Sequence, residues 1–161
     1  MADINNSKLL QTSTGILKKD ACVVLVKTEW NAAITDELES GCRKELERLG
    51  VKKINTLTVP GAFEIPFAIK QHWEETGKKK RADAYIAIGC VIKGDTPHFD
   101  YVCQAVTDGV LHLNLLLPVP SIFAVLTVNN EEQARERMGG KHGHKGVEAA
   151  VTALKMINLK K

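Results

Sequence analysis

The stretch "ACVVLVKT" at residues 21–28 is an almost continuous apolar run, which is typical of a strand that is buried on both faces. Strands covered on both faces belong to parallel sheets, whereas a strand with one wet face alternates apolar and polar residues. Three further runs have strand character: "KINTLTV" at 53–59, "AYIAIGCVI" at 84–92 and "SIFAVLTV" at 121–128. We therefore predict a mostly parallel, four-stranded central sheet.

Helical patterns separate these strands. Between the first two strands, apolar residues recur three or four positions apart at Ile34, Leu38, Cys42, Leu46 and Leu49. Further helices are predicted after the second and third strands, and an amphipathic helix over 147–159 closes the chain. Asn130 with Gln133 forms a capping box for a short helix that we expect to end at Gly139. This order, with right-handed crossovers, predicts a three-layer α/β/α sandwich.

The length of 161 residues fits a single domain, which we place at residues 15–161. Residues 1–14 lack periodicity and are expected to form either a flexible arm or an added edge strand. Because this segment is polar and mixed, we expect neither a signal peptide nor a membrane span there.

Charge and cysteine content narrow the function classes. A net charge of +3, without basic clusters interleaved with aromatic residues, argues against a nucleic-acid partner. The four cysteines are far apart and form no C-x-x-C pair, so we interpret them as reduced thiols. We expect a cytoplasmic protein with no membrane partner.

Ligands of parallel α/β sheets bind beyond the carboxyl ends of the strands. Trp30 follows the first strand, and its ring either packs in the core or forms a stacking platform for a planar heterocycle. Glu64 follows the second strand between apolar neighbours. Its carboxylate either interacts with a helix N-terminus or accepts hydrogen bonds from a polyol.

The third strand leads into "GCVIKGDTPHFDYV" at 89–102, a turn that precedes a helix. Unpaired N–H groups at a helix start, together with the helix dipole, favour an anion. Asp95 and Thr96 can offer backbone N–H groups and a hydroxyl to a phosphate, and Lys93 can add charge. His98 begins the helix and is our candidate for proton exchange near neutral pH.

The segment "RERMGGKHGHKG" at 135–146 concentrates basic residues around four glycines. It is either a solvated linker or an anion clamp that uses Arg137. His142 and His144 are two positions apart, but no third or fourth ligand has suitable spacing, so we predict no metal site.

Taken together, five motifs make the chain resemble the lumazine synthase family over nearly its whole length from about residue 15. They are "EWN" at 29–31, "VPGAFEIPFA" at 59–68, "GCVIKGDTPHFDYVC" at 89–103, "PSIFAVLTVNNEEQARERMGGK" at 120–141 and "GHKGVEAA" at 143–150. The resemblance implies a flavodoxin-like arrangement of the sheet, and it implies that neither a metal nor a redox cofactor is required.

The resemblance also implies a transferase of riboflavin biosynthesis. Members of this family condense 5-amino-6-(D-ribitylamino)uracil with 3,4-dihydroxy-2-butanone 4-phosphate to form 6,7-dimethyl-8-ribityllumazine, releasing phosphate and water. The expected partners are therefore these two small molecules and, because the family builds its sites between subunits, further copies of this chain. Riboflavin synthase is an additional candidate partner.

Matching positions carry the roles of the family's site residues onto this sequence. They are His98 for proton transfer; Trp30 for stacking on the pyrimidine; Ala62, Phe63 and Glu64 for the ribityl chain; the backbone of Cys90, Val91 and Ile92 for the uracil edge; Asp95 and Thr96 for the phosphate substrate; and Phe123 and Arg137, reaching in from a neighbouring subunit, with Arg137 on the phosphate.

The sequence departs from the family pattern in few places. Trp30 stands where many relatives carry Phe, and Lys93 stands where Arg is common, which keeps the charge but loses bidentate geometry. "GGKHGHKG" replaces the usual "GTKAGNKG" without an insertion, and this short form resembles members that assemble from pentamers. We expect a homopentamer and leave open a sixty-subunit icosahedral shell. A flavin or lumazine carrier without turnover is the alternative function, and a shell-forming structural protein is compatible with the enzyme.

Overall fold

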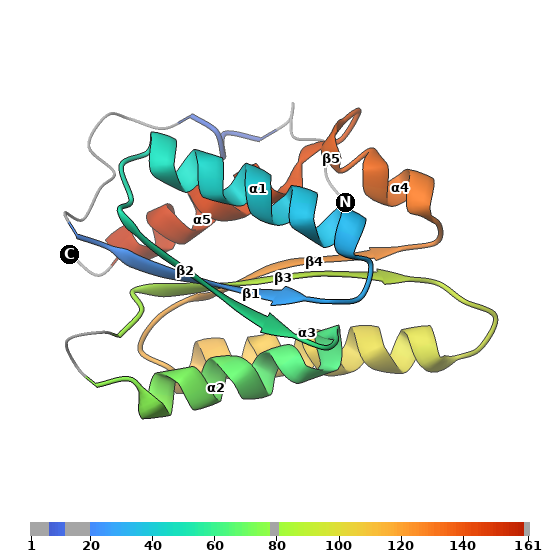
Figure 1. Cartoon of the computed structure of the whole chain (residues 1–161), viewed down its shortest axis with the longest axis horizontal. Coiled ribbons are helices and arrows are strands. Elements are labelled where there is room, and N and C mark those ends of the chain that lie inside the picture. Colours follow the sequence, from blue (N-terminus) through green and yellow to red (C-terminus); the bar gives the residue numbers. More distant parts are fainter. Residues whose placement is uncertain (1–6, 12–19, 78–80, 160–161) are drawn as a thin grey trace.

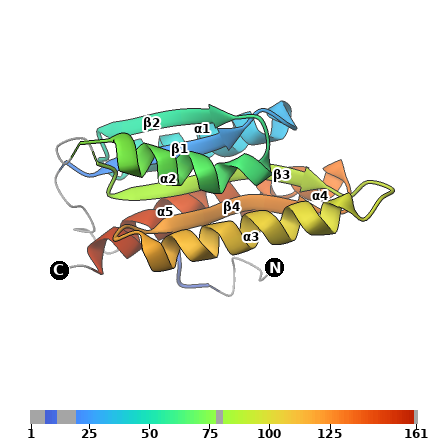
Figure 2. The ribbon, with the colours of Figure 1, turned by 90° about the horizontal axis from the view of Figure 1, so that it is seen from below.

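Four parallel strands form the central sheet of the chain, for which the computed structural model describes residues 7–11, 20–77 and 81–159. The strands are β1 (Cys22–Thr28), β2 (Lys53–Val59), β3 (Ala84–Ile92) and β4 (Ser121–Val128). Their order across the sheet is β2-β1-β3-β4, which Figure 2 shows from below. All three pairings are parallel, so the predicted parallel sheet is confirmed.

Helices cover both faces of this sheet (Figure 1). One face carries α1 (Ala32–Arg48) and α5 (Lys145–Asn158), and the other carries α2 (Ile65–Glu75) and α3 (His98–Leu116). The predicted three-layer α/β/α sandwich is therefore confirmed. The shorter elements are η2 (Ala62–Glu64), α4 (Glu131–Arg135), β5 (Met138–Gly140) and β6 (Gly143–His144).

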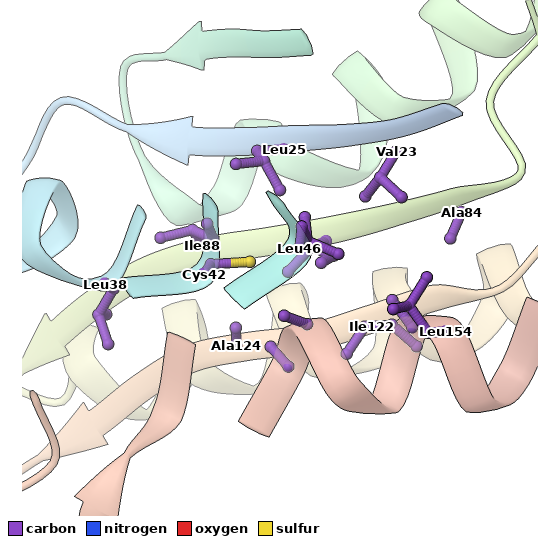
Figure 3. Packing of buried hydrophobic residues seen from close by; sticks show 14 of the residues in the cluster. Val23, Leu25, Leu38, Cys42, Leu46, Ala84, Ile88, Ile122, Ala124 and Leu154 are labelled. Atoms are coloured by element: carbon purple, nitrogen blue, oxygen red, sulfur yellow. The ribbon is translucent and has the colours of Figure 1, made fainter. Parts of the chain in front are cut away.

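Two apolar clusters, one on each face, explain why β1 has no polar alternation. Val23 and Leu25 point toward α1 and α5, where they pack with Leu46 (Figure 3). Val24 and Val26 belong to the cluster on the side of α2 and α3. Burying apolar side chains on both faces stabilises the fold by about 1.5–3 kcal/mol for each large aliphatic residue.

The segment after α4 differs from our prediction. We expected a short helix ending at Gly139, but α4 ends at Arg135 and the chain then forms an antiparallel hairpin of β5 and β6. Gly139 and Gly143 have φ angles of 107° and 73°, which favour glycine and let the chain reverse direction there. One of the two hydrogen bonds of the predicted capping box is present, since Asn130 Oδ1 accepts a 2.9 Å hydrogen bond from Gln133 N.

The outer edge of β4 has no neighbouring strand in the described part of the chain. At Ser121, the first residue of β4, the Asn114 side chain pairs with the backbone as a strand would. Asn114 accepts a hydrogen bond from Ser121 N and donates one to Ser121 O, both at 2.8 Å. Our prediction of an N-terminal arm or edge strand concerns residues that lie mostly outside the described ranges. No helix among the described residues combines the length and apolar character needed to cross a membrane.

Close packing of α5 on α1 generates a prediction for Gly146. A Cβ at this position would lie 2.1 Å from the Leu38 carbonyl oxygen, so backbone would have to move. We expect Gly146→Ala to lower the free energy of unfolding by about 1–3 kcal/mol, measured by urea denaturation. Gly77→Ala is the matched control, because nothing lies within 4 Å of its added Cβ. Equal stability of the two variants would contradict this account of the α1–α5 contact.

Candidate active site

The loop after β1 is held against the end of β2. Glu29 N donates to Val59 O at 2.9 Å, and Trp30 N donates to Pro60 O at 3.3 Å. The Trp30 residue is nevertheless 74% exposed, so the core interpretation of this ring is wrong. The hydrogen-bonded backbone and the exposed ring of Trp30 leave the stacking interpretation open.

A polar cluster fixes α1 to the strands just before this loop. Lys27 Nζ lies 2.9 Å from Glu39 Oε2, and Thr56 Oγ1 donates to Glu39 Oε1 at 2.6 Å. Burial acts to raise the pKa of Glu39, but the hydrogen bonds from Thr56 and Lys27 outweigh it and hold that pKa below its ordinary value. Arg43 extends the cluster to Thr56 at 2.8 Å. The cluster therefore anchors the middle of α1 to β1 and β2, and Trp30 lies in the loop that leads into this helix.

Asn31 connects the β1 loop to the end of β3. Its backbone is left-handed, with φ 57° and ψ 45°, and its Nδ2 donates to Cys90 O at 2.9 Å. Left-handed backbone is uncommon for residues other than glycine, although Asn tolerates it better than most. The same residue thus orients Trp30 on one side and the Cys90 backbone on the other.

The loop after β2 brings a second aromatic ring and a carboxylate to the same place. Phe63 is 64% exposed, whereas Ala62 is buried. A Cβ built on Gly61 would lie 3.0 Å from Glu64 Oε2 and 3.5 Å from Trp30 Cδ1. Glu64 and Trp30 therefore flank Gly61 from two loops.

The end of β3 supplies backbone rather than reactive side chains. Cys90 is buried, and this burial raises the pKa of its thiol to about 11. A thiol of this kind stays protonated at neutral pH and is a poor nucleophile. Val91 and Ile92 complete the strand, and His98 opens α3 across the turn.

One cavity of about 520 Å³ joins these residues, and it includes eight of the twelve predicted site residues. Its lining consists of Trp30, Asn31, Gly61, Ala62, Phe63, Glu64, Cys90, Val91, Ile92, His98 and Val102. Asn31, Gly61 and Val102 were not assigned as site residues from the sequence. All three lie inside the quoted motifs, and for Asn31 and Gly61 the position just after a strand was the available signal.

Asp95 and Thr96 lie on the exposed turn before His98 and are not among the residues that line this cavity. The turn continues from β3, where Lys93 N donates to Val128 O at 2.8 Å. An anion bound at this turn would thus sit beside His98 and outside the pocket that Trp30 borders.

Phe123 and Arg137 are also outside the cavity. Phe123 is on β4, is 41% exposed, and lines a separate groove of about 1130 Å³ along that strand. Arg137 follows α4, and its Nη1 donates to Gln133 O at 2.6 Å. Its Nε is buried without a hydrogen-bond partner among the described residues. A single chain therefore does not bring either residue to the cavity.

The described residues contain no group of three or more His, Cys, Asp or Glu side chains arranged to hold a metal ion. The cavity instead combines an aromatic ring, a carboxylate, strand-end backbone and an imidazole. Fold and cavity together define a parallel α/β protein with a small-molecule site at the carboxyl ends of its strands.

Comparison with known proteins identifies the family. The model of the 6,7-dimethyl-8-ribityllumazine synthase family matches residues 20–161. The chain is 52% identical to the 6,7-dimethyl-8-ribityllumazine synthase of Bacteroides fragilis over 136 residues, covering 83% of this chain and 92% of the relative. It is 43% identical to that of Christiangramia forsetii over 159 residues, or 98% and 93% of the two chains. The chain belongs to the 6,7-dimethyl-8-ribityllumazine synthase family.

The bond from Asn31 to Cys90 generates a prediction for this site. Asn31→Asp keeps the size of the side chain and its tolerance of left-handed backbone, but a carboxylate cannot donate to Cys90 O. We expect the free energy of unfolding to fall by about 1–3 kcal/mol in urea denaturation at pH 7, because a partly buried carbonyl loses its partner. Asn31→Gly is the comparison variant, since it also lacks the hydrogen bond but relieves the left-handed backbone, so it should lose less stability than Asn31→Asp. Wild-type stability of both variants would show that the bond does not hold the loops together.

Proposed function

We propose that this chain catalyses the condensation of 5-amino-6-(D-ribitylamino)uracil with 3,4-dihydroxy-2-butanone 4-phosphate, forming 6,7-dimethyl-8-ribityllumazine with release of phosphate and water. The main observation in support of this reaction is that the matched motifs meet at one cavity, at the carboxyl ends of β1, β2 and β3. Its volume of about 520 Å³ lies within the usual range for small-molecule sites.

In this proposal the pyrimidine stacks on Trp30, whose open ring leaves apolar surface for a flat heterocycle to cover. The backbone of Cys90, Val91 and Ile92 binds the uracil edge. Peptide N–H and C=O groups at a strand end pair well with the alternating donors and acceptors of such an edge.

The ribityl chain lies along Ala62, Phe63 and Glu64. A carboxylate accepts hydrogen bonds from several hydroxyls at once, and such charge-assisted bonds are stronger than neutral ones. Phe63 covers the apolar side of the chain. Glu64 thus favours a polyol over an apolar substituent.

The phosphate substrate binds at the turn before α3, through Asp95 and Thr96 and with the charge of Arg137. Backbone N–H groups at the start of a 19-residue helix favour an anion there. His98, the first residue of that helix and part of the cavity lining, lies between the two subsites and transfers protons during imine formation, phosphate elimination and ring closure. Holding the two substrates close together in a reactive orientation contributes the larger part of the rate enhancement.

Self-association completes this site. Within one chain, Phe123 and Arg137 lie outside the cavity, so a neighbouring copy is the proposed source of both. Exposed aromatic side chains support this, because Trp30, Phe63, Phe67 and Tyr101 are each at least 64% exposed on loops and helices that border the cavity. The strandless edge of β4 offers a second surface for another copy. On the resemblance alone, we also propose a pentamer and riboflavin synthase as a partner. On the cysteine pattern, we propose a cytoplasmic location.

Steady-state formation of the lumazine chromophore tests the reaction directly. We expect turnover well above a control without enzyme, and a loss of about 10²–10⁴-fold in His98→Ala because the proton carrier is gone. His112→Ala is a matched control, since His112 lies on the same helix but outside the cavity lining. Wild-type turnover no faster than the control, combined with tight riboflavin binding, would instead make the chain a carrier.

Mixing two impaired variants, assayed with the phosphate substrate well below its KM, tests whether the site is shared between chains. If His98 and Arg137 meet from different subunits, joint refolding of equal amounts of His98→Ala and Arg137→Ala creates intact sites in about a quarter of the positions. We therefore expect about a quarter of wild-type turnover from the mixture. A mixture no more active than the separately refolded variants would place both residues of each site on one chain.

A further inference from the structure

His144 caps the final helix with its imidazole. It precedes Lys145, the first residue of α5, and its Nδ1 accepts hydrogen bonds from Gly146 N at 3.2 Å and Val147 N at 3.4 Å. A ring nitrogen that accepts a hydrogen bond carries no proton, so the capping ring is the neutral form with its proton on Nε2. Asn is a common residue at such a helix start because its side-chain oxygen accepts the same backbone N–H groups.

The same ring is enclosed by α1. A Cβ on Gly41 would lie 2.2 Å from His144 Cε1, so the ring occupies the space that this glycine leaves free. His144 Nε2 is buried without a hydrogen-bond partner among the described residues and lies 3.7 Å from Glu37 Oε1. Glu37 is therefore the carboxylate that a protonated ring would attract.

His144 is also linked to the backbone of Arg137. His144 pairs with Met138 in the β5–β6 hairpin, and Met138 directly follows Arg137 in the chain. The next residue, Lys145, donates its N–H to Arg137 O at 2.9 Å. The helix cap, the hairpin and Arg137 thus form one connected unit.

We propose that His144 is a positioning residue for Arg137 and that it acts only while its ring is neutral, which makes the grip on the phosphate substrate dependent on pH. Protonation of Nδ1 replaces an acceptor with a donor and removes both capping bonds. The imidazolium then gains attraction to Glu37 at the expense of the cap. This inference rests on the proposed role of Arg137 at the phosphate.

Other charged groups near this unit are already engaged. On α5, Lys145 Nζ lies 2.7 Å from both carboxylate oxygens of Glu148. At the hairpin, Glu136 Oε2 lies 3.7 Å from His142 Nε2 and 3.9 Å from Arg137 Nη1. Glu37 on α1 is left to favour the protonated ring over the cap. In Glu37→Gln, the rise in KM for the phosphate substrate should therefore occur at lower pH.

The hydrogen bonds of the cap set the direction of the pH dependence. Only the neutral ring accepts the two N–H groups, so protonation of the ring in acid removes the cap. We expect the KM for the phosphate substrate to rise in acid while kcat changes less, because Arg137 loses its position and His98 does not.

The test compares wild type with His144→Asn, which caps the helix but does not titrate, from pH 8 to pH 5.5. Effects of pH on the substrates and on the rest of the protein are common to both enzymes, so the ratio of their KM values isolates His144. We expect wild-type KM to rise about fivefold relative to His144→Asn over this range, as expected from a cap of about 1 kcal/mol. His142→Asn is the matched control on the same hairpin and should follow wild type. A KM ratio that does not vary with pH would overturn the proposal.

Amide hydrogen exchange separates this inference from the proposed function. At pH 7, His144→Ala should expose the Gly146 and Val147 amides to faster exchange, whereas His144→Asn should protect them as wild type does. Unchanged exchange in His144→Ala would overturn the cap itself. If Arg137→Ala leaves the KM for the phosphate substrate unchanged while the amides respond as expected, then the role of Arg137 is wrong and the link to the phosphate fails with it.

Discussion

Parallel pairing of β1 with both β2 and β3 is the constraint on which the site depends. Because the three strands run in the same direction, their carboxyl ends meet at one edge, and the loops that carry Trp30, Glu64 and His98 meet there too. Burial of β1 on both faces holds this arrangement, since polar substitution on either face would bury an unpaired group. The single hydrogen bond from Asn31 to Cys90 then fixes two of these loops relative to each other.

The sheet and its cavity were predictable because their signals are local. The runs of β1, β2 and β3 end at Gly, Pro or polar turns, and the cavity is lined by the end of β3 and by residues that follow these three strands. The fate of the Trp30 ring could not be read in this way, because projection into solvent or into the core depends on the left-handed backbone at Asn31. Periodicity carries no information about that torsion angle.

The glycine-rich segment after α4 was the part that periodicity described poorly. Its helix was expected to continue to Gly139, yet glycines with positive φ form a tight hairpin whose strands are too short to show alternation. The role of His144 depends on a contact more than a hundred residues away in sequence, where Gly41 leaves room for the ring. Contacts of this kind arise from the packing of α5 on α1 and have no signature in either segment alone.

If neighbouring copies supply Arg137 and Phe123 as proposed, their separation from the cavity within one chain links ligand binding to assembly. A substrate that touches groups from two chains binds the assembled form more tightly than the separate chains, so by linkage it also stabilises the assembly. The exposed rings of Trp30 and Phe63 act in the same direction, because both a bound heterocycle and a neighbouring chain cover apolar surface that one chain leaves in water. In the proposed assembly the adjacent subunit would close the pocket, so a hinge or lid is unnecessary for excluding water. Because His144 is connected to the β5–β6 hairpin, its protonation would disturb the closed pocket at Arg137. This is the position where the charge of the phosphate must be balanced.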